Sequence, residues 1–318
     1  MISEADLKSH FLIIDGHALI YRAFHAFPPL TNAKGELINA LYGFLRILLS
    51  VLKQVQPDYW LVAFDHPAPT KRKLAFDFYK ANRKPMPDEL RPQITKIEEA
   101  VHKLGIPEMK VAGIEADDII GTISREVCKQ SDVQVLILTG DKDSFQLVND
   151  CIHVLVPNMG RRKEKNDKSM MLEYNPALVK QKMQIPPEKI IDYKALAGDP
   201  SDNIAGVPGI GAKTAINLID KFGSLDEIYQ AIDQENTADL RASVVSKLIN
   251  GRESAYISRQ LATIDQNVTD LDFQLDACRV NGYDKNEVVQ FLNEYGFNSL
   301  IKLLPEDDFD KGLQEALF

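Results

Sequence analysis

The chain has 318 residues, of which 45% are hydrophobic and 26% are charged, and its formal net charge is −9. This length and composition predict one large or two modest globular domains and exclude a disordered chain. The acidic balance disfavours a protein that binds nucleic acid through a general basic surplus, although basic clusters can be hidden in such an average.

Three cysteines, Cys128, Cys151 and Cys278, lie far apart and form no C-x-x-C pair. Their spacing argues against a disulfide framework and against a zinc site. No apolar run approaches the roughly 18 residues of a membrane span, and the run after the polar N-terminus is too short for a signal peptide. We therefore expect a protein of the reducing cytoplasm without a membrane partner.

Three short apolar runs predict buried strands, and each run ends in acidic residues. The runs and their acids are 11–15 with Asp15, 59–65 with Asp65, and 133–147 with Asp141 and Asp143. In the third run a second interpretation is open, because Asp143 or Ser144 could cap a helix that begins at Phe145.

Helical periodicity separates these runs, with apolar residues on one face of 39–53 and of 90–104. A third helical pattern begins near residue 115, and its first turn carries Glu115, Asp117 and Asp118. Acids are common in a first turn, where they complement the helix dipole. The alternation predicts an α/β domain with a mainly parallel sheet, whose ligands bind beyond the carboxyl ends of the strands. We therefore expect the acids to converge there.

Carboxylates that share one cleft require cations. Each like-charged pair near 4 Å costs about 4 kcal/mol at an effective dielectric constant of about 20. Oxygen ligands without histidine or cysteine favour hard ions, so Mg²⁺ or Mn²⁺ is predicted. The set is large enough for two ions, an arrangement suited to phosphodiester hydrolysis, in which one ion activates water and both stabilise charge on the oxygens.

A basic stretch at residues 66–92 interrupts the α/β pattern and is bracketed by prolines, which predicts an insertion that projects from the sheet edge. It is either a solvated charged face or a channel for a single strand, because Phe76, Phe78 and Tyr79 lie beside Lys80 and Arg83. Aromatic rings stack on bases while cations follow the backbone. Lys80 and Arg83 beside a metal site would also stabilise the transition state. A second basic cluster lies at 161–165.

The chain from residue 175 to 304 reads as mostly helical and is followed by an acidic tail. The loop 206–214 is similar to a P-loop, but Ala212 separates Gly211 from Lys213 and no apolar strand precedes it. The glycines suit a tight turn between two helices. Such a turn is either a plain connection or one whose N–H groups hold a phosphate.

Six ordered motifs together resemble the 5′ nuclease domain of bacterial DNA polymerase I and, more widely, the flap endonucleases. The motifs are FLIIDG at 11–16 with YRAFH at 21–25, FD at 64–65, YKANR at 79–83, EADD at 115–118, TGDKD at 139–143, and GDPSDN at 198–203 with GVPGIGAKT at 206–214. The resemblance covers the chain to about residue 304 and implies a PIN-like nuclease core (1–174), a helical arch at about 66–92, a helical DNA-binding region (175–304) and a tail (305–318).

The resemblance assigns nine carboxylates to two metal ions. One ion would be held by Asp15, Asp65, Glu115 and Asp117, with Asp118 nearby, and the other by Asp141, Asp143, Asp199 and Asp202. Arg22, Lys80 and Arg83 would meet the scissile phosphate, and Tyr79 would face a frayed base. Further DNA contacts are expected from Lys71, Arg72 and Lys73 in the arch and from Gly206, Gly209, Gly211, Lys213 and Thr214 in a helix-hairpin-helix-type (H3TH) turn.

By the same resemblance, we expect a structure-specific 5′-3′ exonuclease and flap endonuclease that uses Mg²⁺, with Mn²⁺ as a substitute and K⁺ at the H3TH turn. Its partners would be flapped, nicked or branched DNA, RNA-primer hybrids and a DNA polymerase in cis or in trans. It would act as a monomer at the bacterial nucleoid, in primer removal and repair. The printed sequence contains no polymerase region, which indicates a stand-alone nuclease or the amino-terminal piece of a longer chain.

Two rival functions remain open. An RNA-cleaving nuclease of the toxin type could share an acidic α/β site, but it would need neither the arch nor the turn at 206–214. A non-catalytic DNA-binding module would need the basic elements without a full acidic set. All nine acidic positions are filled here, and this favours an enzyme.

Overall fold

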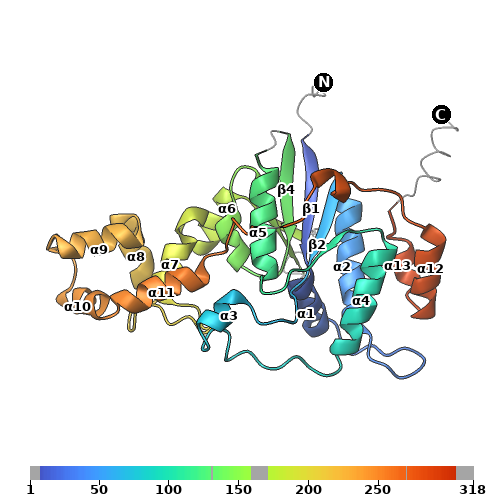
Figure 1. The fold of residues 1–318 in the computed structure, drawn as a ribbon, viewed down its shortest axis with the longest axis horizontal. Coiled ribbons are helices and arrows are strands. Elements are labelled where there is room, and N and C mark those ends of the chain that lie inside the picture. Colours follow the sequence, from blue (N-terminus) through green and yellow to red (C-terminus); the bar gives the residue numbers. More distant parts are fainter. Residues whose placement is uncertain (1–7, 130–131, 159–170, 270, 306–318) are drawn as a thin grey trace, which may run out of the picture.

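The computed structural model describes residues 8–129, 132–158, 171–269 and 271–305. An α/β region holds the sheet, and a smaller lobe of helices extends from it at one end of an elongated molecule (Figure 1). The sheet order is β3-β2-β1-β4-β5-β6, in which only β6 runs antiparallel to its neighbour. The predicted α/β fold with a mainly parallel sheet is confirmed. The strands are β1 (Ser9–Asp15), β2 (Tyr59–Ala63), β3 (Glu108–Met109), β4 (Val133–Leu138), β5 (Ile152–Pro157) and β6 (Met171–Tyr174).

Both faces of the sheet are buried, because alternate residues of each strand point to opposite sides. Leu12 and Ile14 face one layer of helices, and Phe11 and Ile13 face the other. The first layer contains α1 (Gly16–Ala26), α2 (Asn39–Val55), α4 (Arg91–Lys103), α12 (Lys285–Glu294) and α13 (Asn298–Ile301), and the second contains α5 (Ala116–Val127) and α6 (Pro176–Met183) (Figure 1).

The carboxyl ends of the central strands lie side by side, since β1 pairs with both β2 and β4. The predicted convergence of strand ends is therefore confirmed. Two boundaries differ from the prediction. Because β2 ends at Ala63 and β4 ends at Leu138, Asp65 and Asp141 lie on the loops that follow and not on the strands.

The carboxyl-terminal helices form as the sequence predicts. Ser224 caps α9 (Leu225–Asp233) by accepting a hydrogen bond from the Glu227 N–H, and Asp284 caps α12 in the same way. The helices α7 (Ile190–Ala197) and α8 (Ala212–Phe222) flank the glycine-rich turn. The remaining elements are α3 (Lys71–Ala75), α10 (Ala242–Asn250), α11 (Arg252–Ala262), and the 3-10 helices η2 (Asp143–Leu147), η3 (Pro187–Lys189) and η4 (Leu275–Cys278).

Residues 66–92, called the arch segment below, differ from the projecting helical insertion that was expected. Only α3 is helical before α4 begins, and turns follow it. The segment is fastened to the 199–204 loop, where the Lys80 N–H donates to the Asp202 carbonyl at 3.0 Å and the Asn203 side-chain amide donates to the Phe78 carbonyl at 2.7 Å. Buried Tyr79 packs here on Ile204, and this apolar contact explains why the segment folds back.

The cysteine prediction is wrong, because Cys128 and Cys151 form a disulfide. Cys128 follows α5 and Cys151 precedes β5, so the chain brings both to the amino-terminal edge of the sheet although 23 residues separate them. Spacing in the sequence could not show this return. Cys278 is free and buried.

Over the described ranges, no helix has the length and apolar character needed to cross a membrane. The basic cluster at 161–165 and the tail after residue 305 lie outside the described residues.

Candidate active site

Asp15 lies at the centre of the carboxyl edge of the sheet and is only 5% exposed. One carboxylate oxygen accepts from the Ala18 N–H at 3.0 Å and caps α1, and the other accepts from the Thr139 hydroxyl at 2.8 Å. Burial raises the pKa of Asp15 well above its usual range, and the charges of Asp65 and Asp141 raise it further. Among the described residues, no lysine or arginine pairs with this carboxylate.

Three more acids share this character. Asp117 lies in the first turn of α5, where burial and then the charges of Asp15 and Asp141 raise its pKa. Asp65 accepts from the Ala116 N–H at 2.9 Å, and Asp141 accepts from the Asp143 N–H at 2.9 Å. Over the described residues none of the four forms an ion pair with lysine or arginine. The four acids, called the unpaired set below, are Asp15, Asp65, Asp117 and Asp141.

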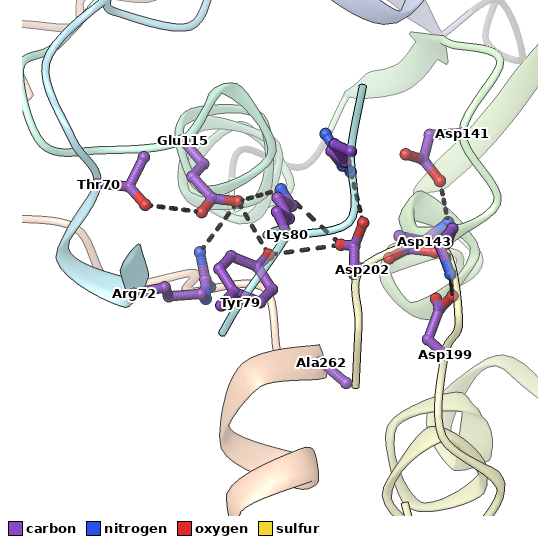
Figure 2. A network of polar contacts seen from close by, with 12 residues as sticks. Thr70, Arg72, Tyr79, Lys80, Glu115, Asp141, Asp143, Asp199, Asp202 and Ala262 are labelled. Carbon is purple, nitrogen blue, oxygen red and sulfur yellow. Dashed lines mark hydrogen bonds and ion pairs between the residues drawn. The ribbon is translucent and has the colours of Figure 1, made fainter. Parts of the chain in front are cut away.

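The other five acids each contact a lysine or an arginine. These acids, called the paired set below, are Glu115, Asp118, Asp143, Asp199 and Asp202. Figure 2 shows two groups of contacts in it, one around Lys80 and the other around Asp143 and Asp199. The two sets therefore differ in charge balance although they occupy one edge of one sheet.

Lys80 connects the arch segment to the paired set. Its Nζ lies 2.8 Å from the Glu115 carboxylate and 3.8 Å from that of Asp202 (Figure 2). Burial alone would raise the pKa of Glu115, but Lys80 and then Arg72 hold it below its usual range. Arg83 also pairs with Asp202. Lys80 and Arg83 thus lie at the acids, as their predicted role at a phosphate requires.

Arg72 points into the protein and forms a two-pronged ion pair with Asp118, with both N–O distances at 2.7 Å. Asp118 also accepts from the Asp265 N–H at 2.8 Å, and Arg72 lies 3.6 Å from Glu115. The Arg72 guanidinium is therefore engaged by these acids in the free protein, and its contact with DNA stays a prediction. Lys71 and Lys73 on either side of it are exposed.

Tyr79 was expected to offer its ring to a frayed base, and the structure corrects this. The side chain is 3% exposed, and its hydroxyl hydrogen-bonds Glu115 at 3.3 Å and Asp202 at 3.4 Å (Figure 2). Burial raises the pKa of the Tyr79 hydroxyl, so it stays a neutral donor. Sequence spacing could not reveal that the ring fills a small core with Ile204 and Leu261.

Sequence reasoning missed Lys194 on α7. Its Nζ lies 2.7 Å from the Asp199 carboxylate and also pairs with Asp143. The side chain is 7% exposed, and although burial lowers its pKa, the two carboxylates raise it above the usual range. The only signal in the sequence is its place four residues after the buried Ile190, on the same face of a short helix.

The alternative interpretation of the Asp141 and Asp143 pair as caps is also resolved. The expected α-helix from Phe145 is the short 3-10 helix η2, which neither Asp143 nor Ser144 caps through its side chain. Asp141 instead accepts from the local backbone, and Asp143 contacts Lys194.

A cleft of about 790 Å³ opens beside this edge. Acids and cations from separate segments of the chain line it, among them Arg22, Arg83, Asp141, Asp143, Lys194 and Asp199. Arg22 donates to the Pro157 carbonyl, while its Nε is buried without a partner among the described residues. A buried N–H without an acceptor is costly, so this arginine fits an anion that enters the cleft.

The acids fit a hard divalent cation in their chemistry. All donors are carboxylate oxygens, and the raised pKa values of Asp15 and Asp117 show that negative charge is in excess. In the part of the chain that the structure describes, however, no three acidic, histidine or cysteine side chains gather closely enough to enclose an ion. Within the paired set, ion pairing accounts for this, since each of its members contacts a lysine or an arginine.

The glycine-rich turn between α7 and α8 has a buried part, at Gly206, and an exposed part, from Gly209 onward. Gly206 is buried with a φ of +64°, its N–H donates to the Ser258 hydroxyl, and a Cβ there would lie 2.3 Å from the Gly198 nitrogen. This corrects its expected role as a phosphate contact, because its N–H is used inside the protein. Gly209, Gly211 and Lys213 are exposed, and Thr214 is half-buried.

The mainly parallel fold and its acidic, arginine-flanked cleft define a metal-dependent nuclease, a hydrolase of phosphodiesters. Residues 10–184 match the family model for the 5′-3′ exonuclease N-terminal resolvase-like domain, and residues 185–286 match that for the 5′-3′ exonuclease C-terminal SAM fold. The chain belongs to the 5′-3′ exonuclease family.

Curated relatives include DNA polymerase I of Caldicellulosiruptor bescii, which is 39% identical over 92% of this chain and 33% of its own length. DNA polymerase I of Pseudomonas aeruginosa is 40% identical over 97% of this chain and 32% of its own length. The chain thus spans about a third of the length of these relatives.

Solved structures with the same fold include the T5 5′-exonuclease, with a TM-score of 0.62, 22% identity, and coverage of 96% of this chain and 98% of that one. Flap endonuclease-1 from Methanococcus jannaschii has a TM-score of 0.56 and 19% identity, and covers 95% of this chain and 93% of that one.

Proposed function

We propose that this chain hydrolyses phosphodiesters of DNA at junctions between single strands and duplex, as a 5′-3′ exonuclease and 5′-flap endonuclease. One observation carries the proposal: acids of both sets lie beside the carboxyl edge of the sheet, and Lys80, Arg83 and Arg22 stand beside them. This chemistry requires acids that bind metal ions and basic side chains that bind phosphate.

The unpaired set would hold a first divalent ion, for which Mg²⁺ is the natural choice and Mn²⁺ the substitute. Asp143 and Asp199, with Asp202 on the same loop as Asp199, would hold a second. When bound, these ions supply activation of water and neutralisation of charge on the phosphate. The chain itself positions the carboxylates, since Thr139 and the Ala18 N–H fix the Asp15 side chain on both sides.

Three cations would orient the scissile phosphate. Arg22 lies in the cleft with an unused N–H, and Lys80 and Arg83 approach from the arch segment. Lys80 and Arg83 are held by acids in the free protein, so a phosphate with its metal ions would replace those acids as their partners. These side chains stabilise charge that develops on the phosphate and release the cut 5′ end.

The lobe of helices would grip the duplex. Gly209, Gly211 and Lys213 are exposed before and within the first turn of α8, whose N–H groups and dipole favour a backbone phosphate. Exposed backbone carbonyls in such a turn also suit K⁺. Lys71 and Lys73 on exposed α3 would contact the single strand, in keeping with their charge.

We further propose that the chain acts as a monomer in the bacterial cytoplasm at the nucleoid, on flaps and RNA primers of lagging-strand DNA. The support is likeness to about a third of the length of DNA polymerase I. A polymerase would then work with it in cis or in trans.

A panel of substrates tests this proposal. The chain is given 5′-flap, nicked, blunt and single-stranded DNA, and matching RNA, with Mg²⁺, and the lengths of the products are measured. We expect cleavage near the flap junction, and its loss in Asp141→Asn with flap binding in Ca²⁺ retained. Cleavage of RNA alone would support a toxin-type nuclease, and binding without any cleavage would support a DNA-binding module.

A further inference from the structure

Lys194 is a buried lysine in contact with two acids from distant parts of the chain. Its Nζ pairs with Asp143 on η2 and lies 2.7 Å from Asp199 on the loop after α7. The backbone around it is fixed, because the next two residues, Ala195 and Leu196, are fully buried in the core of the helical lobe. The Lys194 ammonium group therefore lies in one fixed position between the two carboxylates.

A second lysine in the adjacent cleft shows that the buried position is specific to Lys194. Lys142 lies next to Asp143 and lines the same cleft, yet it is exposed and forms no ion pair among the described residues. Proximity to acids alone is therefore not enough to bury a lysine side chain at this cleft. Lys194 reaches them because α7 packs beside η2 and points the side chain toward both carboxylates.

A divalent cation and this ammonium cannot share the same oxygens. Asp143 and Asp199 are the acids that our proposed function gives to a second ion, and Lys194 already supplies them with a positive charge. A divalent ion that binds these carboxylates is therefore repelled by the ammonium group beside them. Among the described residues, no lysine or arginine pairs with the unpaired set, and its one basic neighbour is His17, 3.9 Å from Asp65.

We propose that Lys194 is a built-in counter-cation at the second metal position. Its ammonium group holds Asp143 and Asp199 together in the free protein, and it must move away before a second divalent ion binds. The inference rests on the proposed function and names a positioning residue of that site. Ions then bind in order, the first at the unpaired set and the second only when Lys194 has moved, for instance toward a substrate phosphate in the cleft that it lines.

The test is Mn²⁺ binding without DNA, followed through the electron paramagnetic resonance signal of free Mn²⁺. The wild-type chain is compared with Lys194→Met, with Lys194→Arg, which keeps the charge, and with Lys142→Met, which removes a charge from the same cleft. We expect one tight and one weak ion in the wild type. Lys194→Met should tighten the weak ion at least about tenfold, while the other two variants change it by less than about threefold.

Retained binding of the tight ion shows that each variant is folded, and Lys194→Gln replaces Lys194→Met if the methionine variant fails this check. A second ion that binds Lys194→Met equally or more weakly would overturn the proposal, as would equal tightening in Lys142→Met. These outcomes leave the tight ion and the nuclease function intact. If the wild type binds no Mn²⁺ at all, the proposed function fails and the inference fails with it.

Discussion

The two sets of acids share one sheet edge but obtain their charge balance differently. The unpaired set is held by backbone N–H groups and by Thr139, and its carboxylates face one another. The paired set is neutralised by side chains from outside the sheet, namely Lys80, Arg83 and Arg72 of the arch segment and Lys194 of α7. The sheet thus fixes the acids. Most of the cations lie on the arch segment, and a bound ligand can replace their contacts with the acids.

The difference in charge balance between the two sets affects the stability of the folded protein. A carboxylate whose pKa is raised makes the ionised folded state less stable, and a divalent cation removes that cost. A buried carboxylate that already has a partner gains less from a metal and loses stability when its partner is removed. The same mutation, aspartate to asparagine, should therefore act in opposite directions on stability at Asp117, whose pKa is raised, and at Asp118, which is paired with Arg72.

The largest effect is expected for Asp117→Asn in the unpaired set. Loss of this carboxylate should lower single-turnover flap cleavage with Mg²⁺ by about 1,000-fold or more, because a ligand of the catalytic ion is removed. Thermal stability at pH 8 in EDTA should rise, since a repelling charge is lost. A variant that cleaves normally, or that is less stable without metal, would contradict the unpaired character of Asp117.

The adjacent Asp118→Asn is the matched variant in the paired set. It weakens the two-pronged contact with Arg72, and we expect a loss of about 1–3 kcal/mol in the free energy of unfolding, measured by urea denaturation in EDTA. Cleavage should fall much less than in Asp117→Asn. A loss of cleavage as large as that of Asp117→Asn, with stability unchanged, would instead place Asp118 among the metal ligands.

The pH dependence of stability tests the unpaired set as a whole. The pKa of Asp15 is raised by burial from 3.8 to about 7. Its ionisation therefore costs nothing below about pH 4 and has its full cost above about pH 7, so the metal-free protein should lose stability as pH rises through this window. Mg²⁺ should raise the melting temperature more at pH 8 than at pH 5.

Asp117→Asn serves as the control for that experiment. Its profile in EDTA should be flatter, and its response to Mg²⁺ smaller, because one of the coupled charges is missing. An equal rise in melting temperature at both pH values would show that Mg²⁺ acts elsewhere on the protein.

The sheet and the acids could be predicted from the sequence because both depend on local patterns. Apolar runs that end in aspartate give the strands, and parallel pairing brings their ends together, as β1 does between β2 and β4. The caps at Ser224 and Asp284 follow from side chains that bond to the next turn of the same chain. Each of these features needs only neighbouring residues or a common topology.

The partners of the acids could not be predicted, since they depend on how separate segments pack. Arg72 and Tyr79 belong to a stretch whose composition suits DNA, and only the fold-back onto the 199–204 loop turns them inward. Lys194 meets Asp143 across a contact between α7 and η2. The disulfide of Cys128 and Cys151 has the same origin, because two chain segments return to one edge of the sheet.

The smallest effect is expected for Thr139→Val, which tests how the unpaired set is positioned. Thr139 donates to the Asp15 carboxylate at 2.8 Å and accepts from the Asp141 N–H at 3.0 Å, so it orders one carboxylate of the set and the backbone of another member. Valine keeps the shape and removes both bonds. A hydrogen bond to a charged group contributes about 1.5 kcal/mol or more, so the Mg²⁺ concentration for half-maximal cleavage should rise about tenfold. Thr139→Ser retains the hydroxyl and should behave as the wild type. If valine leaves the Mg²⁺ requirement unchanged, Asp15 is oriented by the cap of α1 alone, and the unpaired set needs no support from the β4 loop.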